Sequence, residues 1–277
     1  MPSINLATKY SSVLDQLFTH DSYTERYVNN KYSFAGAKTV EVYTVTTVAP
    51  SNYDRTSTGD RFGGNNELQD TVKAYSIAND KGFKIVIDRG NYEQQALAKK
   101  AGEVMKAEMN EQVIPMIDAN RLKVAHAGAE AISQIVTSTA NAYTDFLTAN
   151  AYLDEAQAPA EGRVAFVTPG FYNAIKSKIV TFMTPGINDK ALGKGVVGEL
   201  DGVTIVKVPS KLMPTAGSDC IMWHKDAILG VKQINSTRII TDSELVDGQV
   251  LVGRFVFDTF VLDGKKKAVA AISKSGS

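Results

Sequence analysis

The sequence predicts an α+β protein in which strands, one long helix and a mixed region follow one another along the chain. Residues 39–48 (TVEVYTVTTV) are dense in β-branched side chains, which is typical of a strand. Apolar residues then recur every four positions from Leu97 to Val113, which predicts an amphipathic helix. From residue 126 onward, short apolar runs alternate with helical patterns, which predicts a mixed α/β region.

The composition is that of an ordinary globular protein and argues against several classes of function. The 277 residues carry 30 Lys and Arg against 30 Asp and Glu, and 44% of them are hydrophobic. A protein that holds nucleic acid tightly needs an excess of basic residues on one surface, which this balance does not offer. The single cysteine, Cys220, excludes a disulfide within the chain. Neither a secretory signal nor a run of about 18 apolar residues occurs, so we expect a cytoplasmic protein without a membrane partner.

The first third of the chain contains a long polar loop between predicted strands. Residues 1–36 are polar with scattered aromatic residues and predict an arm. Residues 49–70 (APSNYDRTSTGDRFGGNNELQD) follow the first strand and precede strands predicted at 71–77 and 83–87. Polar loops of this length are usually functional or disordered. Two interpretations therefore remain open: a flexible surface loop, or a two-stranded β-arm that becomes ordered on a neighbouring molecule.

The amphipathic helix is predicted to run from Asn91, as N-cap, to about Ala125. Pro115 lies inside this range and is expected to kink the helix or end it near Ile114. A rod of about 30 residues would be roughly 45 Å long at 1.5 Å per residue, and would act as a spine. Its apolar stripe consists of Leu97, Ala101, Met105, Met109 and Val113.

The region after the long helix is predicted to alternate helices with strands. A helix is expected around 143–153, and a second one begins at Thr168, whose side chain caps it. Residues 250–262 and 267–272 predict two strands joined as a hairpin by Asp263 and Gly264. Further strands are predicted at 163–167, 203–208, 220–223 and 238–241.

No constellation of residues predicts catalysis or metal binding. His20, His126 and His224 are scattered and lack partners at ligand spacing. Cys220 is expected to be a buried, inert thiol, with a nucleophilic pairing of Cys220 and His224 as the alternative. Residues 193–198 (GKGVVG) fit the G-x-G-x-x-G pattern, but a loop precedes them and a strand follows, whereas a phosphate-binding motif opens a helix. We therefore expect no catalytic residue, no metal and no cofactor.

The order of these elements, together with several short phrases, resembles the major capsid proteins of tailed bacteriophages, which have the Hong Kong 97-type fold. The resemblance implies an α+β fold with an N-terminal arm at 1–36 and an extended β-loop at 37–88. It also implies a peripheral domain with the spine helix at 89–125 and 250–277, and an axial domain at 126–249. The phrases are IVID at 85–88, VIPMIDA at 113–119, GELDGV at 198–203 and GRFVFD at 253–258.

The resemblance implies a structural protein and not an enzyme. Such a subunit would assemble into pentamers and hexamers, and then into an icosahedral shell around double-stranded DNA, in the host cytoplasm. Scaffolding, portal and decoration proteins are implied as partners, with the DNA contacted weakly and non-specifically. Because the β-loop of this family lies across a neighbouring subunit, inter-subunit contacts are implied for Asn52, Tyr53, Asp54, Arg55, Asp60, Arg61, Phe62, Asn65 and Asn66. An axial-domain loop is implied for Asn188, Asp189, Lys190 and Lys194.

Two alternatives remain beside the viral capsid. An encapsulin-like nanocompartment shell would keep the fold but would enclose an enzyme in place of a genome. A cytoplasmic α/β enzyme would need an active site within residues 126–249, for which the sequence offers no His, Cys or carboxylate constellation.

Overall fold

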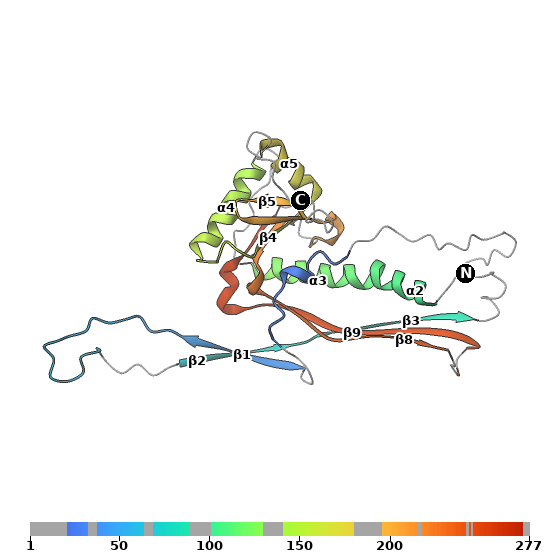
Figure 1. Cartoon of the computed structure of the whole chain (residues 1–277), viewed down its shortest axis with the longest axis horizontal. Coiled ribbons are helices and arrows are strands. Elements are labelled where there is room, and N and C mark those ends of the chain that lie inside the picture. Colours follow the sequence, from blue (N-terminus) through green and yellow to red (C-terminus); the bar gives the residue numbers. More distant parts are fainter. Residues whose placement is uncertain are drawn as a thin grey trace. The chain divides into compact units, whose positions relative to one another are not determined.

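The computed structural model describes residues 21–32, 38–63, 69–88, 101–129, 141–179, 196–214, 218–241, 244 and 246–273. The chain divides into two compact units (Figure 1). One unit is Phe34–Ile77, and the other combines Met1–Ser33 with Ala78–Ser277. Within the described ranges, no helix has both the length and the apolar character needed to cross a membrane.

The smaller unit is built on a two-stranded antiparallel ribbon. Strand β1 (Thr39–Thr46) pairs along its whole length with β2 (Gln69–Ser76). Both strands were expected from their β-branched composition, and the polar residues between them connect the strands as predicted. Residues 79–88, which the resemblance assigns to the same β-loop, form strand β3 and pair with a strand of the larger unit instead.

The larger unit contains a three-stranded antiparallel sheet in the order β3-β9-β8. Strand β3 spans Asn79–Asp88, and its alternate residues Phe83, Ile85 and Ile87 pack in apolar clusters. These clusters also contain Met105 and Val113 from the long helix. The apolar face of the strand, formed by every second residue, therefore packs on the apolar face of the helix, formed by every fourth residue. The other two strands are β8 (Ile228–Ile240) and β9 (Gly248–Val261).

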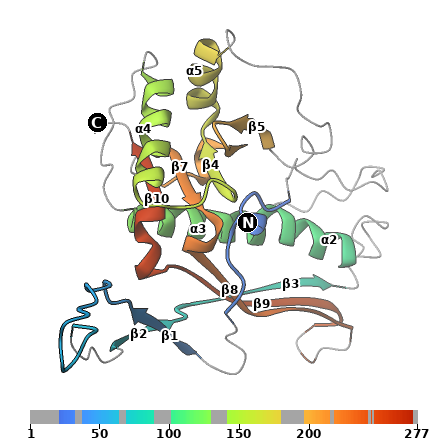
Figure 2. The same cartoon turned by 60° about the vertical axis from the view of Figure 1, so that its left-hand side comes forward.

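The predicted spine is present and passes through Pro115. Helix α2 (Ala101–Glu108), a π-helical turn (Met109–Val113) and helix α3 (Ile114–Gly128) form one continuous rod (Figures 1 and 2). The amide of Ile114 donates to the carbonyl oxygen of Met109, five residues earlier, instead of four. A proline lacks the amide hydrogen and crowds the carbonyl four residues before it, so a local widening of the helix accommodates Pro115 without a break. The expected N-terminal part, from Asn91 to residue 100, lies outside the described residues.

A five-stranded sheet forms the second layered part of the larger unit, in the order β10-β7-β4-β6-β5. Strands β4 and β6 are parallel and the other neighbours are antiparallel. The oxygen Oγ1 of Thr168 accepts from the amide of Phe171 at 3.3 Å, which confirms the predicted cap. The strands are β4 (Arg163–Val167), β5 (Val196–Leu200), β6 (Val203–Lys207), β7 (Ser218–His224) and β10 (Val269–Ser273), and the helices are α4 (Ala142–Glu155) and α5 (Pro169–Ile179).

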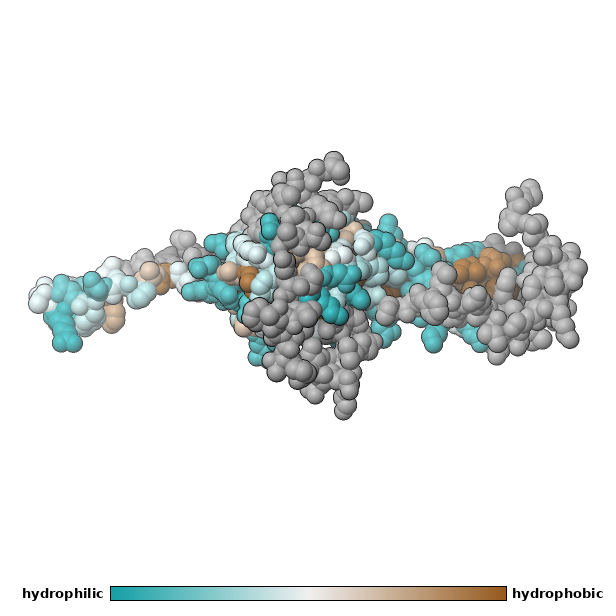
Figure 3. All heavy atoms as spheres, turned by 90° about the horizontal axis from the view of Figure 1, so that it is seen from above, coloured by the Kyte–Doolittle hydropathy of each residue, from teal (hydrophilic) through white to brown (hydrophobic). Residues whose placement is uncertain are grey.

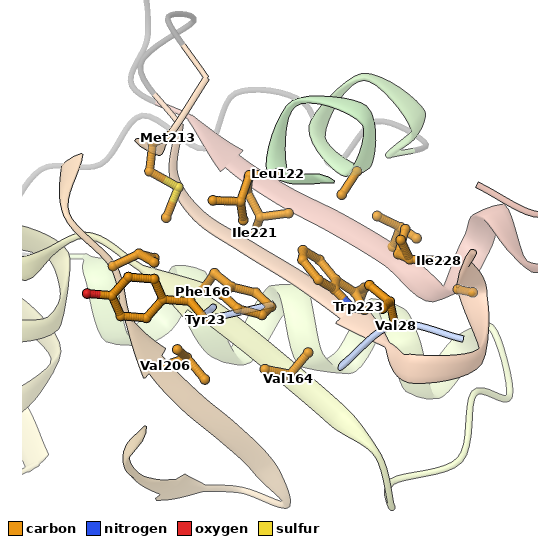
Figure 4. Close-up of a cluster of buried hydrophobic side chains, with 14 of the residues drawn as sticks. Tyr23, Val28, Leu122, Val164, Phe166, Val206, Met213, Ile221, Trp223 and Ile228 are labelled. Atoms are coloured by element: carbon orange, nitrogen blue, oxygen red, sulfur yellow. The ribbon is translucent and has the colours of Figure 1, made fainter. Parts of the chain in front are cut away.

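Both faces of this sheet are covered. Alternate residues of β4 and β7, such as Phe166 and Trp223, pack against Leu122 of α3 (Figure 4). The residues between them, including Cys220, pack against α4 and α5. A strand buried on both faces reads as a continuous apolar run, which is why VAFV in β4 and CIMW in β7 could be recognised from the sequence.

The predicted hairpin across Asp263 and Gly264 is wrong. Residues Asp263–Ala268 form a 3-10 helix, and β10 pairs with β7 of the five-stranded sheet instead of with β9. The residues from Val269 to Ile272 are apolar and buried, so they need a sheet that is covered on both faces. The domain limits implied by the resemblance also divide the sheets, because β8 falls in 126–249 although it pairs with β9.

Residues 21–32, which the sequence predicts as part of an arm, are packed into the larger unit. They contain one 3-10 turn, Glu25–Tyr27, and the side chains of Tyr23 and Val28 are buried in the cluster that contains Trp223. Two further 3-10 turns, Ser210–Leu212 and Lys225–Ala227, connect strands of the larger unit.

Candidate assembly surface

The ribbon of the smaller unit exposes an apolar pair on one of its faces. Tyr43 of β1 lies directly opposite Val72 of β2, and the two side chains are 64% and 47% exposed. On the other face Val42 and Tyr75 are buried. An exposed aromatic and β-branched pair at one cross-strand position stabilises a ribbon only modestly. It leaves apolar area that a second molecule can cover.

The loop that follows β1 holds a defined conformation through its own hydrogen bonds. The amide of Asp54 donates to the carbonyl oxygen of Arg61 at 3.0 Å, and the hydroxyl of Ser51 donates to the carbonyl oxygen of Phe62. The guanidinium of Arg61 donates through Nε to the carbonyl oxygen of Ser57 at 3.1 Å. These bonds close residues 51–62 into a compact loop.

Two aromatic rings lie together on this loop. Tyr53 and Phe62 form an edge-to-face pair with ring centroids 5.0 Å apart, and their side chains are 50% and 75% exposed. Aromatic side chains held rigidly on a surface lose little conformational entropy on binding, which makes them effective anchors in interfaces. The pair therefore gives the loop an exposed apolar surface that the polar sequence around it does not suggest.

The loop that carries the aromatic pair also carries charged groups of both signs. Hydrogen bonds from the hydroxyl and amide of Thr56 hold the pKa of Asp54 below its ordinary value. The carboxylate is therefore ionised at neutral pH. Asp60 accepts from the amide of Phe62 at 2.9 Å, and Arg55 and Arg61 supply two positive charges. Specific protein interfaces commonly combine an apolar centre with charged and polar groups.

The structure brings most of the predicted β-loop residues into this one loop. Asn65 and Asn66 lie outside the described residues, as do all four predicted axial-loop residues: Asn188, Asp189, Lys190 and Lys194. Those placed in the loop are Asn52, Tyr53, Asp54, Arg55, Asp60, Arg61 and Phe62.

Sequence reasoning missed Tyr43 and Val72 as candidate contact residues. The signal was present, because the alternation in TVEVYTVTTV puts Tyr43 on the opposite face to Val42, and both faces of the strand are therefore apolar. Of the nine large apolar side chains that are exposed in the described part of the chain, five lie in the smaller unit: Tyr43, Val48, Tyr53, Phe62 and Val72.

The larger unit has its own exposed apolar residues at one end of the three-stranded sheet. Val86 of β3 and Ile240 of β8 both pair with Val250 of β9, so the three residues form one row across the sheet. Val86, Ile239 and Ile240 are exposed. Hydrophobic residues gather at the end of this unit that carries α2 and the ends of these strands (Figure 3).

The structure gives no support to a nucleophilic pair of Cys220 and His224. Cys220 is fully buried, and burial raises the pKa of its thiol, with the charge of Asp219 adding to the effect. Both ring nitrogens of His224 are engaged locally: Nδ1 accepts from the amide of Asp226 at 3.2 Å, and Nε2 lies 3.0 Å from the carbonyl oxygen of Glu161. Among the described residues, no group of three or more His, Cys, Asp or Glu side chains could hold a metal ion.

Cys220 is expected to resist thiol reagents until the protein unfolds. Only the thiolate reacts with such reagents. Burial raises the pKa of the Cys220 thiol, so the ionised fraction is far smaller than in a free cysteine, whose pKa is about 8.5. Labelling with a chromogenic disulfide reagent at pH 8 should give no signal from the native protein and one thiol per chain in denaturant. Rapid labelling of the native protein would contradict the burial of Cys220.

Comparison with solved structures shows what this arrangement is similar to. A chain from a structure of Mycobacterium phage Che8 matches with a TM-score of 0.75 and 20% identity, covering 100% of both chains. The capsid structure of the cyanophage P-SCSP1u matches with a TM-score of 0.75 and 14% identity, covering 98% of this chain and 93% of the other. The mature capsid of bacteriophage PhiM1 matches with a TM-score of 0.70 and 11% identity, covering 99% and 93%.

The chain has the fold of phage capsid proteins. This confirms the fold class that the sequence predicts, and the matches cover 98 to 100% of this chain. No protein-family model matches the sequence, and no curated protein matches it either. The fold is therefore shared with chains that are only 11 to 20% identical in sequence.

Proposed function

We propose that this chain is the major capsid protein of a tailed bacteriophage. The observation that carries the proposal is the full-length match to phage capsid chains, which leaves no large part of the described chain without a counterpart. In this role the protein is structural and not catalytic. It assembles into pentamers and hexamers that form an icosahedral shell around double-stranded DNA, and its location is the virion, assembled in the host cytoplasm.

The smaller unit supports this proposal because it carries most of the exposed large apolar side chains in the described residues. A two-stranded ribbon is marginal by itself, and a copy of the same chain that covers Tyr43, Tyr53, Phe62 and Val72 would stabilise it. The domain names follow as part of the proposal. The three-stranded sheet with the spine is the peripheral domain, and the five-stranded sheet with α4 and α5 is the axial domain.

The overall charge also suits a shell around DNA. With 30 basic and 30 acidic residues, the subunit has no net charge that would hold packaged DNA tightly. We propose weak, non-specific contact with the DNA, together with scaffolding, portal and decoration proteins as further partners.

The test is the assembly state of the full-length protein and of a loop variant. Wild-type protein should form rings or shells that are visible by negative-stain microscopy. The double variant Tyr53→Ala with Phe62→Ala should keep the same circular dichroism spectrum while shells are lost, because its aromatic anchors are gone.

Thr58→Ala, an exposed change in the same loop, is the matched control and should assemble normally. Wild-type protein that remains a compact monomer under all conditions would contradict the proposed function. Normal shells from the double variant would contradict the role of the loop alone. Shells that co-purify with one enzyme would favour the nanocompartment alternative.

A further inference from the structure

The segment Ser22–Lys31, here termed the clasp, is held by a buried carboxylate of α3. Asp118 is 1% exposed and accepts three hydrogen bonds from consecutive residues of the clasp. The hydroxyls of Ser22 and Thr24 each donate to Oδ1 at 2.6 Å, and the amide of Tyr23 donates to Oδ2 at 2.9 Å. A carboxylate that is buried in this way depends on its donors, because each lost donor leaves acceptor capacity unsatisfied.

A buried guanidinium one helical turn further along α3 holds the next part of the clasp. Arg121 is 1% exposed, donates to Oγ1 of Thr24 at 3.0 Å and lies 2.8 Å from the carboxylate of Glu25. Lys232 of β8 lies 2.7 Å from the same carboxylate. Burial acts to raise the pKa of Glu25, but Arg121 and Lys232 outweigh it and hold the pKa below its ordinary value. Glu25 is thus the charged link between α3 and β8.

The second half of the clasp lies on β7 and β8. The indole of Trp223 donates to the carbonyl oxygen of Tyr27 at 2.7 Å, and Asn29 exchanges backbone hydrogen bonds with Ile228 and Gly230 at 2.7 and 3.1 Å. Gly230 leaves the space that Val28 fills, since a Cβ atom at this position would lie 2.7 Å from Cγ2 of Val28. Figure 4 shows Val28 beside Trp223.

The backbone pairing of the clasp is separate from the strand pairing of the elements that it joins. Its single bridge, between Asn29 and Leu229, lies outside the ladders by which β8 pairs with β9 and β7 pairs with β4 and β10. Opening the clasp therefore breaks no strand pairing within either sheet. If only part of the clasp opened, Asp118 or Arg121 would stay buried without its partners. A partly open state would therefore be high in free energy, because a buried charge without a partner is strongly destabilising.

We propose that Ser22–Lys31 opens and closes as one unit, and that when closed it fixes the point from which the chain continues toward the ribbon unit. The clasp thereby ties the spine helix to both sheets at the place where the chain leaves the larger unit. Its end is held by Lys31, whose Nζ lies 3.1 Å from the carboxylate of Asp226. The consequence for shells rests on the proposed function; the cooperative opening does not.

The test uses two variants of the full-length protein that loosen opposite ends of the clasp. Gly230→Ala crowds Val28 on the β8 side, and Ser22→Ala with Thr24→Val removes two of the three donors to Asp118. Each variant should speed trypsin cleavage after both Arg26 and Lys31 by about tenfold or more, since an unsatisfied or crowded buried group shifts a local equilibrium by at least that factor. Trp223, the single tryptophan, should shift its emission to longer wavelength.

Gly102→Ala is the matched control, because no atom lies within 4 Å of a Cβ built there, and it should leave cleavage and emission unchanged. Cleavage after Lys123, an exposed residue of α3, should stay slow in all variants. Equal acceleration at Arg26 and Lys123 would overturn the proposal, because the whole unit would then unfold. Release of Lys31 with Arg26 still protected would overturn the single-unit opening.

Assembly provides a separate readout. Variants with an open clasp should be folded but deficient in shells. Normal shells from these variants would overturn the positioning role of the clasp. Wild-type protein without shells would overturn the proposed function, and the cleavage result alone would then test whether the clasp opens as one unit.

Discussion

Arg163→Ala is expected to lower the free energy of unfolding by about 3 to 5 kcal/mol, since several hydrogen bonds from a charged group and the packing of a buried side chain are lost together. The Arg163 side chain is 3% exposed and holds the turn after α4. Its guanidinium donates to the carbonyl oxygens of Pro159 and Ala158, and Nη1 donates to Oδ1 of Asn150 at 2.7 Å. Nη2 also lies 2.7 Å from the carboxylate of Asp154.

The loss should be this large because alanine takes a donor from the buried Oδ1 of Asn150, removes the hydrogen bonds that hold two carbonyl oxygens of the turn, and opens a cavity in the same place. Urea unfolding followed by circular dichroism measures the change. Arg254→Ala is the matched control: Arg254 forms two hydrogen bonds with Asp80, at 3.0 and 2.6 Å, but both side chains are exposed. The unfolding midpoint of this control should barely move, since exposed ion pairs contribute little. Equal effects of the two substitutions would contradict the buried role of Arg163.

Phe166→Ala should be the second most damaging change, at about 3 to 5 kcal/mol of lost stability. Phe166 is fully buried, stacks on Trp223 with ring centroids 4.3 Å apart and meets the edge of Tyr27 at 5.8 Å. The substitution therefore removes contacts with β7 and with the clasp in one step and leaves a cavity between them. Urea unfolding followed by far-ultraviolet circular dichroism measures the loss without depending on the fluorescence of Trp223.

The same substitution at Phe62 separates stability from assembly. Phe62 is 75% exposed on the loop, so Phe62→Ala should change the free energy of unfolding by no more than about 0.5 kcal/mol. It should nevertheless weaken shell formation, whereas Phe166→Ala acts through folding. If Phe62→Ala destabilised the subunit as much as Phe166→Ala, the loop would belong to the folded core and would not be a contact surface.

Periodicity identified the main elements because it reports the local environment of each residue. Val42 and Tyr43 already indicated a strand, and the four-residue spacing of Ala101, Met105 and Val113 indicated the spine. Both patterns depend on which side of an element is buried, and that is decided within a few residues of sequence. The cap at Thr168 was visible for the same reason.

The sequence could not identify the pairing partner of a strand where a local turn signal competed with burial of the strand against distant residues. Asp263 and Gly264 favour a hairpin locally, yet the run from Val269 to Ile272 gains more by entering a sheet that is covered on both faces. The exposed pair of Tyr53 and Phe62 was likewise invisible, because it depends on hydrogen bonds that bring positions nine residues apart together.

The sequence by itself determined the kinds of elements, their order and the polar loop between the first two strands. It also determined that one cysteine and three histidines are the total available to any site. Only the tertiary structure decided that residues 22–31 are a clasp and not a free arm. Their hydrogen-bond partners, Asp118 and Arg121, lie more than 90 positions away, and a polar segment carries no local sign of a distant buried charge that it must satisfy.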